Sequence, residues 1–268
     1  MAIAKDKTRI EFSRVAPSVG ARVSGVAIDE AFDPDVAHRL QAALAEYGVL
    51  FFEFGRTISE EEQRKFGRLF GEVEPVYGFS TGKNASGLID ARIQSLKEYR
   101  TSIWHSDGTP FETPPLGALL AAVEPPELGG GTMFANMGAA YDALSPHYQR
   151  LLDGLEVLHT TFRTPFVRQK SEAVHPAVIR DPITGRKLLF VNATYSQSFV
   201  GLEDRESESL MHFICEHINQ PEFHCTMNWQ IGSMVVWHNR VVQHRAVDSF
   251  IGERKLRRVT ILGDKPAA

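Results

Sequence analysis

Short apolar segments of strand length recur along this 268-residue chain, and they limit the folds open to it. Gly- and Pro-rich turns separate them. The expected strands are 9–15, 48–54, 116–123, 155–162, 187–191, 224–229, 233–237 and 257–262. Helical periodicity is confined to fewer segments: 34–47, 60–70, 139–154 and 206–218. Because strands and helices do not alternate regularly, a doubly wound sheet is disfavoured and an α+β fold is expected.

Many strands with few helices favour a sandwich or a jelly roll with the helices packed outside. We expect a double-stranded β-helix (jelly roll) core. Hydrophobic residues make up 43% of the chain and charged residues 23%, which is the balance of an ordinary globular protein with a sizeable core. No change of composition divides the chain, so a single domain over residues 1–268 is expected.

The charge balance argues against nucleic acid as a partner. With 29 basic and 33 acidic residues the formal net charge is -4, so no long-range positive field is expected. No apolar run approaches the roughly 20 residues that span a bilayer, so no membrane partner is expected. Cys215 and Cys225 lack CxxC spacing and no signal peptide is recognised, which predicts free thiols and a cytoplasmic protein. The oligomeric state stays open, a homo-oligomer included.

One group of residues carries metal-binding chemistry. His105 and Asp107 are two residues apart, so on an extended segment both side chains project from the same side. His244 follows far along the chain, after an apolar strand. Two imidazoles and one carboxylate are the ligand set of iron(II) oxygenases. On its own, a His-x-Asp pair is weak evidence for a metal, and a satisfied polar pair at a strand end is the plainer interpretation.

The order of motifs around these residues resembles the taurine dioxygenase family, which also includes phenoxyacetate-herbicide dioxygenases and alkylsulfatases. The resemblance covers most of the chain. Its motifs are Gly20-Ala-Arg-Val-Ser-Gly25, Phe70-Gly-Glu, Trp104-His-Ser-Asp-Gly-Thr-Pro-Phe-Glu-Thr-Pro-Pro115, Gly129-Gly-Gly-Thr-Met133, Ala140-Tyr-Asp-Ala-Leu-Ser145, His175-Pro, Leu189-Phe-Val-Asn192 and Arg258-Val-Thr-Ile-Leu-Gly-Asp-Lys-Pro266.

The resemblance implies an enzyme that uses Fe(II), O2 and 2-oxoglutarate and releases succinate and CO2. It assigns iron to His105, Asp107 and His244, and the far carboxylate of 2-oxoglutarate to Thr132 and Arg254. The basic run 254–258 would ordinarily be a solvated face. In either a strand or a helix, however, Arg254 and Arg258 share a face, so both guanidinium groups can point into one pocket.

Three alternatives stay open. The distal family motif usually reads Trp-Asp-Asn-Arg, but His238 stands here in place of the acid and could compete with His244 as a ligand. The favoured role for His238 is instead that of a hydrogen-bond partner beside the metal ligands. A zinc hydrolase could use the same ligand set, although no His-Glu-x-x-His is present. A non-catalytic jelly-roll binding protein is the third alternative.

The prime substrate is expected to be a small organic acid of the sulfonate, alkyl sulfate or aryloxyalkanoate type. By the resemblance, Arg258 binds its acid group, and the other substrate residues are Glu74, Tyr77, Thr101, Phe162 and Tyr195. Glu74 and Thr101 depart from the residues of taurine-using relatives, so taurine is expected to be a poor substrate; a taurine dioxygenase proper is the alternative. Core packing is the plain alternative for Phe162 and Tyr195. Residues 78–87 are rich in Gly and Ser and could form a lid, and the alternative for Glu74 is that it turns to solvent in such a mobile loop.

Overall fold

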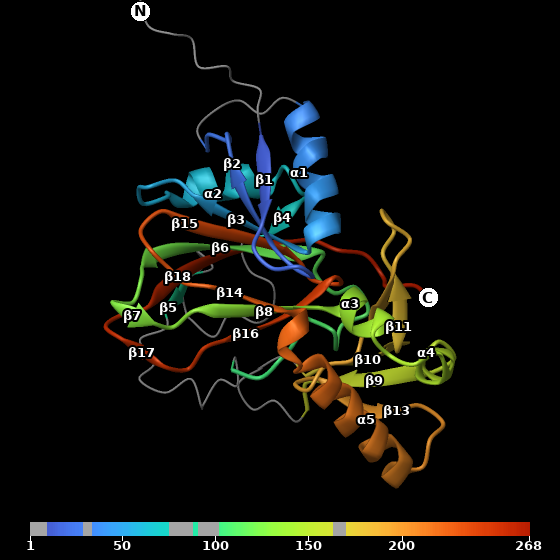
Figure 1. Cartoon of the computed structure of the whole chain (residues 1–268). Coiled ribbons are helices and arrows are strands. Elements are labelled where there is room, and N and C mark those ends of the chain that lie inside the picture. The colour runs from blue at the N-terminus through green and yellow to red at the C-terminus, as the bar shows by residue number, and fades with distance from the viewer. Residues whose placement is uncertain (1–9, 29–33, 75–87, 91–101, 163–169) are drawn as a thin grey trace, which may run out of the picture.

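A large sheet, mostly antiparallel, runs through the molecule (Figure 1). The computed structural model describes residues 10–28, 34–74, 88–90, 102–162 and 170–268. The strand order is β1-β2-β3-β15-β6-β18-β4, and β5 also pairs with β18. The strands are β1 (Glu11–Arg14), β2 (Ala21–Ser24), β3 (Val49–Glu53), β4 (Val73–Glu74), β5 (Leu88–Asp90), β6 (Gly117–Glu124), β15 (Ser233–His238) and β18 (Lys255–Ile261).

Both faces of this sheet are buried at its centre, which explains why its strands read as continuous apolar runs. In β15 the side chains alternate between two hydrophobic clusters, because successive residues of a strand point to opposite faces. Val235 and Trp237 enter one cluster, and Met234 and Val236 enter the other. The sheet therefore needs a covering layer on each side.

Two helices cover one face. Helix α1 (Pro34–Tyr47) contacts β3 and β15, and α2 (Glu60–Gly67) contacts β6 and β18 (Figure 1). Helix α2 begins at a capping box: the Ser59 hydroxyl accepts from the Glu62 N–H, and the Glu62 carboxylate accepts from the Ser59 N–H.

A three-stranded sheet covers the other face. Its order is β14 (His224–Met227), β8 (Thr132–Asn136) and β16 (Val242–Ala246), with β8 in the centre. Phe134 of β8 packs against Phe51 and Trp237 of the large sheet, at ring-centroid distances of 5.9 and 6.0 Å. The two sheets thus lie face to face, and the space between them holds the larger hydrophobic cluster.

The remaining elements lie beside this pair of sheets (Figure 1). Strands β10 (Glu172–Pro176), β9 (Glu156–Thr160) and β13 (Ser196–Phe199) form a second three-stranded sheet, and α5 (Asp204–Ile218) contacts β13. Two antiparallel two-stranded pairs complete the fold: the consecutive strands β11 (Val178–Arg180) and β12 (Lys187–Leu189), and the strands β7 (Leu128–Gly129) and β17 (Phe250–Ile251), which are far apart in the sequence. A 3-10 turn covers Pro221–Phe223.

The expected mixture of many strands and few helices is confirmed, but the helix expected over 139–154 is wrong. That segment holds two helices, α3 (Met137–Asp142) and α4 (Pro146–Leu152). The break follows from Ser145, which caps α4, and from Pro146 at its first position, where a residue without an N–H starts a helix but does not continue one. Among the helices described, none is both long and apolar enough to cross a membrane.

Candidate metal centre

The two histidines predicted to bind iron lie opposite each other on paired segments. His105 forms an isolated antiparallel bridge with His244 of β16, with N–H to carbonyl hydrogen bonds of 3.2 and 2.9 Å in the two directions. Their ring centroids are 4.3 Å apart. Backbone pairing therefore brings together two side chains that are far apart in the sequence, and it holds them on the inner side of the β14-β8-β16 sheet.

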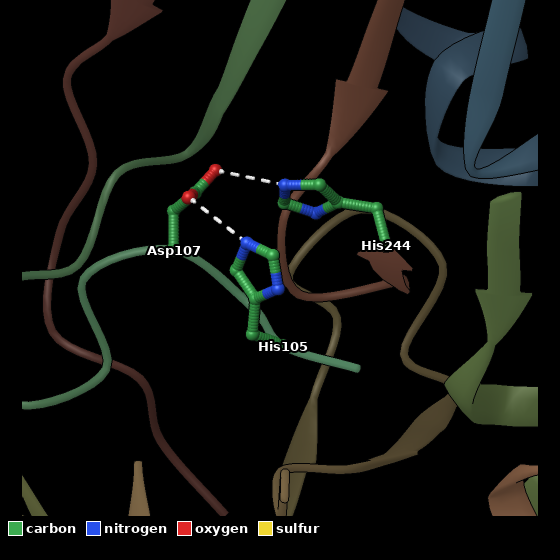
Figure 2. A group of neighbouring side chains, drawn as sticks. All are labelled: His105, Asp107 and His244. Carbon is green, nitrogen blue, oxygen red and sulfur yellow. Dashed lines mark ion pairs between the residues drawn. The ribbon is translucent and has the colours of Figure 1, made fainter. Parts of the chain in front are cut away.

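Asp107 completes the group. Its Oδ1 lies 3.9 Å from His105 Nε2 and its Oδ2 lies 3.6 Å from His244 Nε2 (Figure 2). All three residues are buried, and their ligand atoms lie within 4.8 Å of one another. In the described part of the chain this is the one cluster of His, Cys, Asp or Glu that could hold a metal ion.

The protonation states suit metal binding. Burial lowers the pKa of His105, and it lowers the pKa of His244 to about 3, so both imidazoles are neutral near pH 7. Burial alone would raise the pKa of Asp107, but the charge of Arg258 and its hydrogen bonds to the carboxylate hold that pKa well below its usual range. Metal ligation requires neutral imidazole and ionised carboxylate, which is the state found here.

The ring orientation of His105 also fits a metal. Its Nδ1 lies 2.8 Å from the Ile103 carbonyl oxygen, which can only accept, so Nδ1 carries the proton. The lone pair of Nε2 then faces Asp107, as metal-binding histidines require. Two imidazoles and one carboxylate on one side leave the other coordination positions open, which is the arrangement of non-haem iron(II) oxygenases.

The structure brings Thr132 and Arg254 together, as the resemblance implies. The Arg254 guanidinium donates from Nε to the Gly130 carbonyl at 2.7 Å and from Nη2 to the Thr132 hydroxyl at 3.4 Å. Gly130 has a φ of +63°, and a Cβ there would lie 3.1 Å from Arg254 Cδ. The glycine-rich turn thus makes room for the arginine stem. Trp229 donates to the same hydroxyl at 3.2 Å.

Arg254 is a buried cation that no carboxylate of the described chain pairs with. Its exposed fraction is 6%, and burial lowers its pKa to about 10, so it keeps its charge at neutral pH. Thr132 pairs with Ala246 on β16, and Phe134 pairs with His244, so Thr132 and His244 are diagonal neighbours about 7–8 Å apart. A short dicarboxylate could therefore reach both Arg254 and the metal ligands.

Arg258 lies beside the metal ligands. Its Nη1 and Nη2 donate to Oδ1 and Oδ2 of Asp107 at 3.1 and 2.7 Å, and its guanidinium carbon lies 5.5 Å from the centroid of the Trp237 ring. Tyr195 is buried with its ring 6.3 Å from that of His105, in an edge-on arrangement. Burial raises the pKa of Tyr195, so its hydroxyl is neutral.

The other predicted substrate residues are placed only in part. Tyr77, Thr101 and the segment 78–87 lie outside the described residues, and of Glu74 only the backbone is described, where it pairs with Thr260 of β18. Phe162 is 61% exposed, so core packing, which was its plain alternative, is wrong.

His238 turns away from the cluster. Its Nδ1 accepts from the Arg240 N–H at 3.3 Å, and its Nε2 lies 3.5 Å from Oδ2 of Asp181, which is also buried. The sequence analysis missed Asp181, because nothing in its spacing relates it to β15. It also missed Asn239, although Asn239 stands inside the distal motif Trp237-His-Asn-Arg240.

Known proteins share both the sequence pattern and the fold. The family model for taurine catabolism dioxygenase TauD, TfdA family, matches residues 11–260. An alpha-ketoglutarate-dependent dioxygenase of Penicillium expansum is 31% identical over 94% of this chain and 77% of its own length. An alkylsulfatase of Acinetobacter baylyi is 28% identical over 96% of this chain and 86% of its own. The crystal structure of a taurine dioxygenase from Burkholderia xenovorans superposes with a TM-score of 0.83 and 30% identity, covering 96% of this chain and 92% of that one. The chain therefore belongs to the TauD/TfdA family of dioxygenases.

Proposed function

We propose that this protein is an Fe(II)- and 2-oxoglutarate-dependent dioxygenase that hydroxylates a small organic acid. The observation that carries the proposal is the combination of two adjoining groups of buried residues. One is the cluster His105, Asp107 and His244, already in the protonation state for ligation. The other is the buried Arg254 beside Thr132, a cation that a ligand carboxylate would pair with.

Each residue has a separate task. His105, Asp107 and His244 hold the iron, and Arg254 with Thr132 binds the far carboxylate of 2-oxoglutarate through charge-assisted hydrogen bonds. Iron with 2-oxoglutarate supplies the activation of O2, releasing succinate and CO2. The protein orients both organic molecules, and the apolar residues between the sheets exclude water from the reaction.

The substrate class rests on Arg258. Its guanidinium pairs with Asp107 through Nη1 and Nη2, and the second N–H of each of these nitrogens is proposed to donate to a carboxylate, sulfonate or sulfate group. The match to an alkylsulfatase and to a taurine dioxygenase supports an organic anion of sulfonate, alkyl sulfate or aryloxyalkanoate type. Tyr195 and Phe162 are proposed to contact the body of this substrate, together with Glu74, Tyr77 and Thr101.

Taurine itself is proposed to be a poor substrate, because Glu74 would place like charge near a sulfonate and Thr101 supplies no amide donor. A panel of taurine, other alkylsulfonates, alkyl sulfates and aryloxyalkanoates, scored by substrate-dependent succinate release, tests this. Efficient turnover of taurine at micromolar KM would make the protein a taurine dioxygenase proper.

The architecture is proposed to be a double-stranded β-helix in a single domain over residues 1–268. The face-to-face packing of the β14-β8-β16 sheet on the large sheet supports it. We further propose a cytoplasmic enzyme with Cys215 and Cys225 as free thiols, since both are unbridged. A homo-oligomer is compatible with this proposal, and nucleic acid and membrane partners are not part of it.

Anaerobic titration tests the reaction class. Fe(II) and 2-oxoglutarate added together without O2 should produce the weak visible charge-transfer band of the chelate, and O2 with substrate should then release succinate. Folded, iron-loaded protein that shows no such band would refute the assignment. The same result would favour one of the two alternative functions, a zinc hydrolase or a non-catalytic binding protein. The match to the dioxygenase family disfavours both.

A further inference from the structure

The backbone of Asp107 is held on both sides by one side-chain amide. Asn239 Oδ1 accepts the Asp107 N–H at 2.7 Å, and Asn239 Nδ2 donates to the Asp107 carbonyl at 2.8 Å. Nδ2 also donates to the Pro115 carbonyl at 3.1 Å. The amide thus binds the N–H and C=O of the same residue, in the way a neighbouring strand does in a sheet.

This contact replaces a strand partner that Asp107 does not have. His105 is fixed by its backbone bridge to His244, but Asp107 lies two residues later in a turn, outside that bridge. A buried N–H or C=O without a partner is unfavourable, so the Asn239 amide removes a cost that would otherwise favour another conformation of the turn.

Asn239 is itself rigidly placed. It is fully buried and follows the last residue of β15, at the centre of the large sheet. Its own N–H donates to the Leu116 carbonyl at 2.8 Å, and the next turn is closed by a 3.0 Å hydrogen bond from Val241 to His238. The amide therefore fixes the turn that carries Asp107 relative to the large sheet.

We propose that Asn239 is a positioning residue of the metal centre, which sets the backbone of Asp107 so that its carboxylate meets the imidazoles of His105 and His244. The inference rests on the metal site of the proposed function. Asn239 touches no reacting group; it acts through Asp107. Removing a residue that hydrogen-bonds to a metal ligand typically weakens metal affinity roughly 10- to 100-fold. The reason is that the ligands must be held within about 0.5 Å of the required geometry.

The chain offers a matched control for the loss of a buried amide. Asn136 is equally buried and also makes three hydrogen bonds: its Oδ1 accepts from Gly138 and Ala139 at 2.8 and 2.9 Å, and its Nδ2 donates to Ser18 at 2.7 Å. It caps α3 and touches no proposed ligand. Replacing Asn136 is therefore expected to lower stability as much as replacing Asn239 does, without disturbing the position of Asp107.

The experiment measures Co(II) affinity by calorimetry and by visible absorption, with urea unfolding of the metal-free proteins alongside. Wild type, Asn239→Ala, Asn239→Asp, Asn136→Ala and Asp107→Ala are compared. Asn239→Ala should weaken Co(II) binding on the order of 10- to 100-fold and alter the absorption bands, whereas Asn136→Ala should leave both unchanged at a similar loss of stability.

Asn239→Asp keeps the acceptor for the Asp107 N–H but loses both donated bonds, so it should also weaken Co(II) binding. If Asn239→Ala does not fold, the Co(II) affinity of Asn239→Asp tests the positioning role instead. Wild-type affinity and spectrum in a folded Asn239 variant would overturn the inference, as would an equal loss in Asn136→Ala. Equal Co(II) binding by wild type and Asp107→Ala would instead show that the proposed metal site is wrong.

Discussion

The guanidinium of Arg258 and the carboxylate of Asp107 form a two-point ion pair, with hydrogen bonds of 3.1 and 2.7 Å. The same arginine is proposed to bind the acid group of the substrate, and the same aspartate is proposed to bind iron. Arg258 therefore places a positive charge next to a metal ligand. Metal and substrate affinity are linked through this pair, since each proposed ligand interacts with one of its two members.

Replacing Arg258 with Gln should tighten Co(II) binding, roughly 10-fold or about 1.4 kcal/mol, because a cation no longer opposes the metal at Asp107. Orientation of Asp107 should survive, since Asn239 holds its backbone. Calorimetric titration measures the affinity. Arg257→Gln is the control, as Arg257 points to the other face of β18 and donates to Gln63. Weaker Co(II) binding in Arg258→Gln would mean that the arginine acts chiefly by orienting Asp107.

Arg254→Gln should chiefly raise the KM for 2-oxoglutarate. A lost charge-assisted contact costs about 1.5–3 kcal/mol, which corresponds to roughly 10- to 150-fold. Steady-state succinate release at varied 2-oxoglutarate gives the KM. Arg258→Gln, measured in the same assay, should mainly affect the prime substrate. Equal effects of the two changes on the KM for 2-oxoglutarate would contradict this division of tasks.

His238→Ala should keep the metal but lose stability. The imidazole carries its proton on Nε2, because Nδ1 accepts the Arg240 N–H, and it faces Asp181 rather than the metal ligands. Removing it leaves the buried Arg240 N–H without its acceptor, which costs about 1–3 kcal/mol. Urea unfolding measures the loss and Co(II) titration measures the site. Loss of Co(II) binding in His238→Ala, with His244→Ala keeping it, would reverse the choice of distal ligand.

The variants His238→Ala and Asp181→Ala and their combination give a second test of the same pair. A double-mutant cycle in urea isolates the contact from the two single changes. We expect the double variant to be more stable than the sum of the single losses predicts. Additive losses would show that the two side chains do not interact.

The helices and strands that could be predicted from the sequence are those with a local cause. Strands such as β15 stand out because both faces are buried, and α2 because Ser59 and Glu62 form a capping box. Strand β8 was not expected: it starts at Thr132, immediately after the glycine-rich turn, and is too short to show a period. The helix break at Pro146 did have a local signal, which the apolar periodicity of 139–154 outweighed.

The residues of the candidate site could be predicted from the sequence, but the contacts between them could not. The resemblance to the taurine dioxygenase family was enough to select His105, Asp107, His244, Thr132 and Arg254, which the fold brings into two adjoining groups. The pairing of Arg258 with Asp107 joins residues 151 positions apart, and that of Asn239 with Asp107 joins residues 132 apart. Such contacts depend on how β15 and β18 are placed next to the turn of Asp107, which no local pattern specifies.

The capping box of α2 should make part of the stability depend on acid pH. Glu62 accepts from the Ser59 N–H at 2.7 Å and pairs with Arg56 at 2.6 Å, and the bonds to Arg56 and Ser59 lower its pKa from 4.5 to about 2. A carboxylate whose pKa is lower in the folded state stabilises the fold above its unfolded pKa. The contribution of Glu62 is therefore complete above pH 4.5 and is lost as the pH falls toward 2.

Glu62→Gln should lower the unfolding free energy by about 1 kcal/mol at neutral pH, a value kept small because Arg56 is half-exposed and its ion pair is screened. The difference between wild type and Glu62→Gln should shrink between pH 4.5 and 2. Urea unfolding across this range measures it. Glu61→Gln is the control, since Glu61 is exposed on the same turn and lies outside the capping box. A wild-type advantage that stays constant from pH 7 to pH 2 would show that the Glu62 carboxylate does not supply this stability.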